Sequence, residues 1–234
     1  MSLPFVKMQA QGNDFVILDA IGHQLPDMDT EFVKKICHRH FGIGCDQLLI
    51  LQTSDDADAW LEIYNADGSS AANCGNGLRC VAALLMSRLA CEKVSIGLAD
   101  RVIHAQRTKH GVQVNMGKVV VEQVHDDFLD VNMGNPHRVS FAGEILCPER
   151  NVEIVSSYNQ HEVFIRIIER GTGETLACGS GACASAIAVW KKLNMQSPLT
   201  VHMPGGDVVV SMENENVLLE GAVQTVFSGE YCLS

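Results

Sequence analysis

The strongest constraint on the fold is an internal repeat built around two glycine-flanked cysteines. Cys74 lies in the segment NCGNG and Cys178 in the segment ACGSG, and each segment opens a stretch rich in small apolar residues. Each stretch predicts a buried helix of about three turns. A single glycine turn that happens to hold a cysteine is common, but two matching copies indicate a duplicated structural unit. The repeat therefore predicts two similar domains related by a pseudo-twofold axis.

The repeat extends upstream of both cysteines. Asn65 and Glu169 each stand nine residues before a cysteine, and each follows an extended apolar segment. Further upstream, GND at 12–14 and GNP at 134–136 begin the two halves. From the asparagine of these segments to the cysteine there are 61 residues in the first half and 43 in the second. The shorter spacing predicts that the second half lacks about one hairpin of chain.

The segments that follow the two predicted helices are typical of strands. Runs such as VSIGL, VQVNM and DVVVSM are β-rich and are separated by Gly, Asp and Asn turns. No long amphipathic helical pattern lies between them, which disfavours a parallel βαβ sheet. We expect an α+β fold of two pseudo-symmetric domains, each a curled, mainly antiparallel β-sheet around a central helix. The first domain is expected at 1–117 plus about 225–234, and a shortened second domain at 118–224.

Composition excludes several classes of protein. With 47% hydrophobic residues in 234, the chain can bury a sizeable core, and its net charge of −11 argues against a nucleic-acid or anionic-membrane surface. No apolar run approaches the ~18 residues of a membrane span. The N-terminal segment lacks the pattern of a secretory signal. We expect a cytoplasmic protein with no nucleic-acid partner and no membrane partner.

The cysteine pattern argues against a disulfide framework and against a metal site. There are nine cysteines, an odd number, and no secretory signal. No two Cys-x₂-Cys spacings occur, as a zinc ribbon would need. Cys178 and Cys183 have the Cys-x₄-Cys opening of a plant-type iron–sulfur site, but Ala186 stands at the next ligand position. We therefore predict no metal, and expect most thiols to be small core residues.

Cys74 and Cys178 call for a chemical explanation. A helix start presents unpaired N–H groups and about half a positive charge, which favours a thiolate and can hold a carboxylate. If the pseudo-twofold axis brings both thiols to one cleft, one can remove a Cα proton and the other can return a proton to the opposite face. Such chemistry inverts a stereocentre without a Schiff-base lysine or a metal. Phosphate-binding glycine motifs are absent from the sequence, and we expect no cofactor.

Several longer motifs resemble those of the diaminopimelate epimerase family. They occur in both halves in the family's order: QGNDFVILD, RHFGIGCDQLL, YNADGSSAANCGNGLRC, NMGNPH, ERN, ERGTGETLACGSGAC and the PGG at 204–206. The resemblance implies a PLP-independent epimerase that interconverts LL- and meso-diaminopimelate by two-cysteine proton abstraction and donation at Cα. Its place would be lysine and peptidoglycan precursor biosynthesis. The implied partner is a small-molecule amino-acid substrate, and a homodimer is allowed.

The resemblance also implies roles for individual residues. It assigns proton transfer to Cys74 and Cys178, and tuning of the thiol pKa values to His137 and Glu169. Arg170 is suited to grip a distal carboxylate bidentately. The implied substrate-binding residues are Asn13, Gln47, Asn65, Gly75, Asn76, Asn135, Asn151, Glu169, Arg170, Gly179 and Ser180.

Two alternatives of function stay open at this point. One is a racemase of the same fold that acts on another amino acid, such as histidine or proline. Retention of Arg170 together with Asn65, Asn135 and Asn151 favours a substrate with a second amino-acid head group. The other alternative is a catalytically inactive paralogue that binds an amino acid or a partner protein. The presence of every expected catalytic side chain argues against it.

Overall fold

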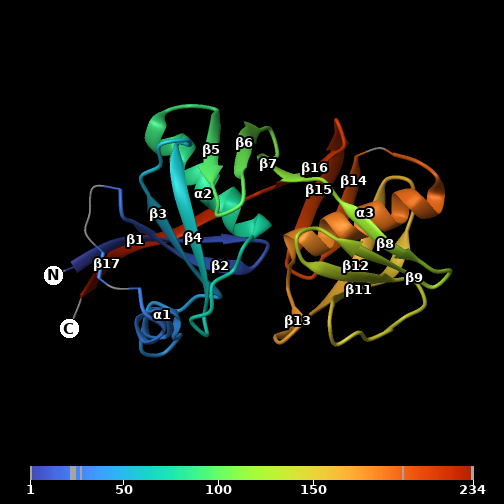
Figure 1. Cartoon of the computed structure of the whole chain (residues 1–234), viewed down its shortest axis with the longest axis horizontal. Helices are drawn as coiled ribbons and strands as arrows, with labels where there is room; N and C mark the ends of the chain where they lie inside the picture. The colour runs from blue at the N-terminus through green and yellow to red at the C-terminus, as the bar shows by residue number, and fades with distance from the viewer. Residues whose placement is uncertain (1, 22–24, 27, 197, 233–234) are drawn as a thin grey trace. The chain divides into compact units, whose positions relative to one another are not determined.

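The computed structural model describes residues 2–21, 25–26, 28–196 and 198–232. The chain divides into two compact units, one of residues 1–112 and 223–234 and the other of residues 113–222. Each unit contains one long helix together with β-strands (Figure 1). The predicted α+β fold of curled, mainly antiparallel sheet is therefore confirmed.

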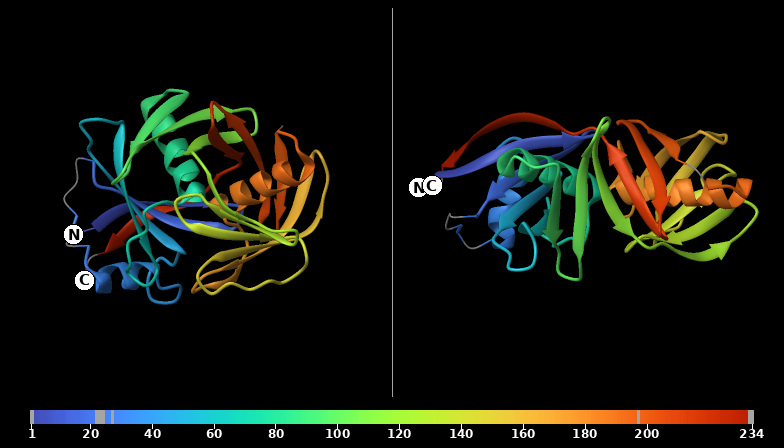
Figure 2. Two further views of the ribbon diagram at one scale, coloured as in Figure 1. Left: turned by 45° about the vertical axis from the view of Figure 1, so that its right-hand side comes forward. Right: turned by 90° about the horizontal axis from the view of Figure 1, so that it is seen from above.

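In the first unit, helix α2, Gly75–Leu89, packs against strands within residues 2–19 and 93–108. The pairing order is β17, β1, β2, β3, β4, β5 and β6, and β1 and β17 run side by side (Figure 2). These strands are β1 (Ser2–Ala10), β2 (Asn13–Asp19), β3 (Gln47–Gln52), β4 (Ala59–Asn65), β5 (Lys93–Gly97), β6 (Val102–Thr108) and β17 (Gln224–Cys232).

In the second unit, helix α3, Gly179–Leu193, packs against most of the strands. These strands pair in the order β8, β9, β10, β11, β12, β14, β15 and β16, with β13 beside β12 and β7 beside β16. The strands are β7 (Gly111–Gly117), β8 (Val120–Val124), β9 (Phe128–Asn132), β10 (Pro136–Ser140), β11 (Asn151–Tyr158), β12 (Glu162–Glu169), β13 (Gly173–Thr175), β14 (Leu199–Met203), β15 (Gly206–Glu213) and β16 (Asn216–Gly221).

The two units repeat the same strand pattern. Strands β1 to β6 correspond, in order and in pairing direction, to β9, β10, β11, β12, β14 and β15. The central helix of each unit lies in a β–α–β crossover, β4–α2–β5 and β12–α3–β14, whose strands pair in parallel. From Gln47 to Cys74, and from Asn151 to Cys178, the spacing is 27 residues. Residues of the two halves can therefore be compared position by position.

The length difference between the halves lies in one connection and is not a lost hairpin. Residues 20–46 join β2 to β3 and contain helix α1, Thr30–Cys37, whose first turn is capped by Asp29 through Phe32 N. Residues 141–150 join β10 to β11 with neither a helix nor a strand. The prediction of a missing hairpin was therefore wrong. An eight-residue helix among polar loops is too short to give a clear helical periodicity.

Helices α2 and α3 are buried around most of their circumference. In α3 the buried residues are Gly179 and residues 181–190, and in α2 they include residues 75–82. A helix buried on all sides needs no polar face, which explains the lack of an amphipathic pattern. Among the described residues, no helix combines the length and the apolar character that a membrane crossing requires.

Candidate active site

Cys74 is the N-cap residue of α2, in extended backbone conformation with φ −151°. Its Sγ accepts a hydrogen bond from the backbone N–H of Gly77 at 3.3 Å and lies 4.0 Å from Asn13 Oδ1. The side chain is half-buried. An amide N–H and the helix N-terminus both favour negative charge at this position. The first unit therefore presents a sulfur atom suited to act as a base.

Four amide side chains of the first unit form two hydrogen-bonded pairs, and one pair lies beside Cys74. Asn76 donates from Nδ2 to Asn13 Oδ1 at 3.2 Å, and both residues belong to the predicted substrate contacts. Gln47 donates from Nε2 to Asn65 Oδ1 at 2.9 Å across the β3–β4 pair. The Oε1 atom of Gln47 is buried and has no hydrogen-bond partner among the described residues. These amides offer both donors and acceptors, as recognition of an ammonium and a carboxylate requires.

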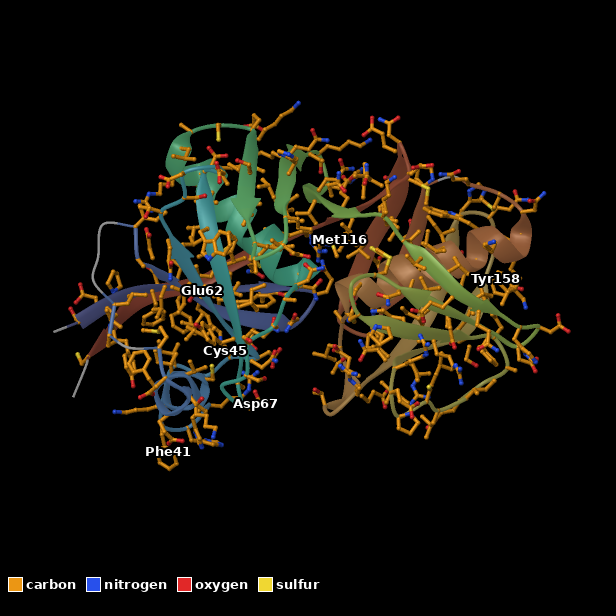
Figure 3. All side chains as sticks on the ribbon, in the orientation of Figure 1. Phe41, Cys45, Glu62, Asp67, Met116 and Tyr158 are labelled. Carbon is orange, nitrogen blue, oxygen red and sulfur yellow. The ribbon has the colours of Figure 1, made fainter. Side chains whose placement is uncertain are left out.

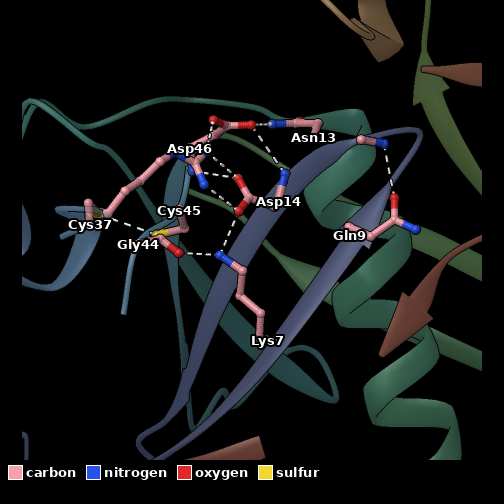
Figure 4. A network of polar contacts seen from close by, with 10 residues as sticks. Lys7, Gln9, Asn13, Asp14, Cys37, Gly44, Cys45 and Asp46 are labelled. Atoms are coloured by element: carbon pink, nitrogen blue, oxygen red, sulfur yellow. Dashed lines mark hydrogen bonds and ion pairs between the residues drawn. The ribbon is translucent and has the colours of Figure 1, made fainter. Parts of the chain in front are cut away.

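A charged network holds Asn13 in place (Figure 4). Asn13 donates from Nδ2 to Asp46 Oδ2 at 2.8 Å, and Arg39 links Asp46 to Asp14. Lys7 is buried and lies 2.6 Å from Asp14 Oδ2. Burial alone would raise the pKa of Asp14, but the hydrogen bonds from Arg39 and Lys7 outweigh it and lower that pKa well below its usual range. Arg39 thus holds the Asp46 carboxylate in place as the acceptor for Asn13.

Cys45 and Cys37 lie beside this network (Figure 4), and Figure 3 labels Cys45 within the first unit. The two buried sulfur atoms are 3.5 Å apart, and Cys45 belongs to a cluster of apolar core residues. The hydrogen bond with Cys37 and burial together raise the pKa of Cys45 well above its usual range. Both thiols are core groups without access to solvent.

Cys178 is the N-cap residue of α3, and its surroundings differ from those of Cys74. It makes no side-chain cap hydrogen bond; its Sγ lies 3.5 Å from Ser180 Oγ instead. The residue is buried, and burial raises the pKa of the Cys178 thiol well above its usual value, with further increases from the charges of Glu169 and Glu153. Cys178 is therefore held as a protonated thiol, which is the form of an acid.

Ser180 connects Cys178 to a buried histidine. His137 Nε2 lies 3.0 Å from Ser180 Oγ and 3.1 Å from Asn135 Oδ1. On the other side of the ring, His137 Nδ1 lies 2.8 Å from Glu153 Oε1. The structure thus brings Asn135, His137, Ser180 and Cys178 together, as one hydrogen-bonded chain that ends at Glu153.

The other predicted residues of the second unit lie near this chain. Glu169 accepts a hydrogen bond from Thr175 Oγ1 at 2.7 Å, and burial raises its pKa. Asn151 accepts from the backbone N–H of Arg170 at 2.9 Å, so its side chain shapes the end of β12. The guanidinium of Arg170 is exposed, with one long hydrogen bond of 3.4 Å to Glu149 O. Arg170 is not part of the hydrogen-bonded chain.

One cluster among the described residues is compact enough to hold a metal ion. Candidate ligand atoms of His137, Glu153 and Cys178 lie within 4.8 Å of one another. Both imidazole nitrogen atoms of His137 already have hydrogen-bond partners. Hydrogen bonding therefore accounts for the closeness of these groups.

Sequence comparison places the chain among known proteins. The family model for diaminopimelate epimerase matches residues 5–122 and 143–226. A diaminopimelate epimerase of Aromatoleum aromaticum is 35% identical over 274 residues, covering 98% of this chain and 99% of the relative. One of Halothermothrix orenii is 32% identical over 280 residues, covering 98% of both chains. The chain belongs to the diaminopimelate epimerase family. Membership makes it an enzyme of the isomerase class, as the motifs predict.

Solved structures with low sequence identity share the fold of this family member. A phenazine biosynthesis protein of the PhzF family from Enterococcus faecalis has a TM-score of 0.78 at 15% identity, with full coverage of both chains. A hydroxyproline epimerase from Agrobacterium vitis has a TM-score of 0.72 at 12% identity, covering 98% of this chain and 92% of the other. The fold therefore carries several chemistries, and the side chains of the site must decide among them.

Glu153 is the main site residue that sequence reasoning missed. It lies in the strand segment NVEIV, where a charged residue flanked by apolar ones resembles an ordinary solvent-facing strand position. The only signal in the sequence is that both neighbours, Val152 and Ile154, are apolar, and both are buried in the structure. A strand that is buried on both faces leaves no exposed side for a carboxylate. Asp46, which accepts a hydrogen bond from Asn13, was also missed.

Proposed function

We propose that this epimerase-family enzyme interconverts LL- and meso-diaminopimelate, with Cys74 and Cys178 as its two proton-transfer groups and without a cofactor. One observation carries the proposal: equivalent cysteines form the N-caps of the central helix in both units. A catalytic pair explains why a cysteine, a weaker cap than Ser, Asp or Asn, stands at both positions.

The proposed reaction needs one base and one acid. A thiolate takes the Cα proton, and the electron pair of the broken C–H bond moves into the α-carboxylate. The other thiol then gives its proton to the opposite face of Cα and becomes the thiolate. The N–H groups at a helix start have no intrahelical acceptor, so they can stabilise the negative charge on the carboxylate.

The surroundings of the two cysteines support a division of roles in the resting enzyme. The hydrogen bond from Gly77 N to the Cys74 sulfur favours a thiolate there. The raised pKa of Cys178, caused by burial and by Glu169 and Glu153, favours a thiol. Cys74 then acts as base and Cys178 as acid in one direction, and the roles reverse in the other direction.

Arg170 supports a substrate with two amino-acid head groups. Its exposed guanidinium makes a single long hydrogen bond, so it can still bind a second carboxylate bidentately. The amides of Gln47 and Asn65 offer further donors and acceptors. A racemase for a monocarboxylic amino acid, such as histidine or proline, would have no use for such an arginine.

The biological setting is part of the proposal. The reaction would serve lysine and peptidoglycan precursor synthesis in the cytoplasm. A homodimer is proposed through the β17 edge of the first unit, where Val226 and Phe227 are exposed. Light scattering on the purified protein distinguishes a dimer from a monomer, and Phe227→Glu should favour the monomer.

Hydrogen exchange with solvent tests the activity. The reduced protein is incubated with LL-diaminopimelate in deuterated water, and product stereochemistry and Cα deuterium are followed. Meso product carrying solvent deuterium supports both substrate and mechanism. No exchange with diaminopimelate but exchange with proline or histidine would favour the same-fold racemase, and no exchange with any amino acid would favour the inactive paralogue.

A further inference from the structure

We infer that Glu153 is a positioning residue that fixes the orientation of His137 and thereby the direction of the hydrogen bonds from Cys178 through Ser180. The inference deepens the proposed function and rests on it. Glu153 would act through the 2.8 Å contact between its Oε1 and His137 Nδ1. It would not touch the substrate.

The first unit provides an internal comparison. Phe15 pairs with Gln47 between β2 and β3, and His137 pairs with Asn151 at the equivalent place between β10 and β11. Two residues further along the second strand of each pair stand Leu49 and Glu153. The pair Phe15 and Leu49 therefore occupies the same structural positions as His137 and Glu153.

All four of these side chains are 0% exposed. The fold thus fills one position with an apolar pair in one unit and with a polar pair in the other. Buried ion pairs are often neutral or unfavourable for stability when compared with apolar residues of similar volume. The polar pair in the second unit is therefore not required by the architecture, and its retention indicates a chemical role.

Burial of Glu153 also carries a cost. Its Oε2 is buried and has no hydrogen-bond partner among the described residues. Gly181 in the first turn of α3 lies against the carboxylate, so a Cβ atom at that position would come within 2.3 Å of Glu153 Oε1. A buried carboxylate oxygen without a partner destabilises a fold. The first unit avoids this cost with Leu49.

Glu153 gives the hydrogen-bonded chain a direction. A carboxylate can only accept, so His137 must donate from Nδ1–H, and Nε2 is then the acceptor in the neutral ring. Ser180 can donate its hydroxyl proton to Nε2 at 3.0 Å, which leaves its oxygen lone pairs for the Cys178 thiol at 3.5 Å. In the other tautomer, Nε2–H can donate to Asn135 Oδ1 at 3.1 Å.

The direction of these hydrogen bonds determines whether Cys178 is held as a thiol. With Nδ1–H fixed, the chain accepts the S–H of Cys178 and keeps it as the proton donor. Without an acceptor at position 153, the proton of His137 can move to Nε2, and Ser180 then turns its hydroxyl proton toward the sulfur. The side chains that face the Cys178 thiol are His137 from β10, Glu153 from β11 and Glu169 from β12.

Glu153→Leu and Glu153→Gln test the inference. The leucine substitution copies Leu49 of the first unit but leaves the buried Nδ1–H of His137 without its acceptor, so this variant should fold with a lower Tm than the wild type. Its kcat should fall by about 10- to 100-fold, a part of what general acid–base catalysis contributes. KM should stay within about threefold, since no substrate contact is lost. Glu153→Gln keeps an acceptor oxygen and should recover part of kcat.

A second readout does not depend on activity. Nitrogen-15 NMR of histidine-labelled protein reports which ring nitrogen of His137 carries the proton. The wild type should show a protonated Nδ1, and Glu153→Leu should show a shift toward protonated Nε2. Val155→Ala on the same strand is the matched control. It removes buried packing and should lower Tm while the His137 spectrum and kcat stay near those of the wild type.

Three outcomes decide the matter. A Glu153→Leu variant that folds, keeps the wild-type tautomer and keeps wild-type kcat would overturn the inference. A Glu153→Leu variant that changes as Val155→Ala does, with a lower Tm but with kcat and the His137 spectrum near those of the wild type, would reduce Glu153 to a packing role and overturn it as well. If the wild type epimerises no diaminopimelate, the proposed function fails, while the NMR comparison still decides whether Glu153 positions His137.

Discussion

Gly181 and Glu153 are in such close contact that a Cβ atom on Gly181 would lie 2.3 Å from Glu153 Oε1 and 3.0 Å from its Cδ. The equivalent glycine of the first unit, Gly77, has looser surroundings. A Cβ atom there would meet Leu49 Cδ1 at 3.2 Å and Cys74 Sγ at 3.4 Å. The two helix starts are therefore alike in sequence, but the side chain of Glu153 approaches Gly181 more tightly than the side chain of Leu49 approaches Gly77.

This contrast predicts different effects of the same substitution. Gly181→Ala should displace the Glu153 carboxylate from His137, and epimerisation should fall by about tenfold or more, as expected when a catalytic group is misplaced. Gly77→Ala should lose less activity, since Leu49 can shift and alanine gains about 1 kcal/mol of helix propensity. Rates and Tm of both variants check the prediction. Equal losses in the two variants would show that crowding at the helix start matters, and not the Glu153 contact.

Each of the two N-cap cysteines should be needed for inversion but not for folding. Cys74→Ala and Cys178→Ala each remove one proton-transfer group, and epimerisation should drop by at least about 10²-fold. Both positions lie at helix N-caps where cysteine contributes little capping energy, so the Tm should stay within about 5 °C. Circular dichroism and the deuterium exchange assay measure both quantities. Wild-type inversion by either variant would contradict the two-thiol mechanism.

The repeat could be predicted from sequence because its marks are local. A Cys-Gly-x-Gly turn, a following run of small residues, and strand segments at fixed spacing all lie within some 40 residues of each cysteine. Helix α1 could not be predicted in this way, since its stability depends on Val33 and Ile36 packing into the apolar core cluster of the first unit. The prediction therefore explained the extra length of the first half by a hairpin missing from the second half, whereas the extra length is the connection that contains α1.

The site was predictable where a residue stands in a glycine or asparagine turn, as Cys74, Asn135 and His137 do. It was not predictable where a charge is buried by tertiary contacts. Glu153 looks like a surface residue in sequence, and only the equivalence with Leu49 shows that its position belongs to the core. Burial of a carboxylate is decided by strands that come together from distant segments, and no local pattern records it.

Thiol reactivity should follow burial. Cys232 is exposed and Cys91 and Cys147 are half-buried, whereas Cys37, Cys45, Cys80 and Cys183 are buried. In the native protein, iodoacetamide should label the first group within minutes and leave the buried group unlabelled until urea is added. Peptide mass spectrometry identifies the labelled sites. Labelling of Cys37 or Cys45 in the native protein would contradict their place in the core.

Removal of metal ions should leave the activity unchanged. The cluster of His137, Glu153 and Cys178 is close enough for a metal, but its imidazole nitrogens are used in hydrogen bonds. Dialysis against EDTA, followed by assay in metal-free buffer, should therefore give the rate of the untreated protein. Loss of activity that returns with added zinc would show that the cluster binds a metal ion and that the hydrogen-bonded chain is not its working form.

Asp14 should make the first unit sensitive to acid. Its pKa is lowered by Arg39 and Lys7 despite burial, so its stabilising effect is fully present above the unfolded-state value of about 3.9 and is lost as the pH falls toward the native pKa. Asp14→Asn would leave the buried Lys7 ammonium uncompensated and should cost on the order of 3 kcal/mol at pH 7. Urea unfolding between pH 7 and pH 3 measures both effects. The difference between wild type and variant should shrink at the acid end, where Asp14 gains its proton in the unfolded chain; a difference independent of pH would assign the loss to packing and not to charge.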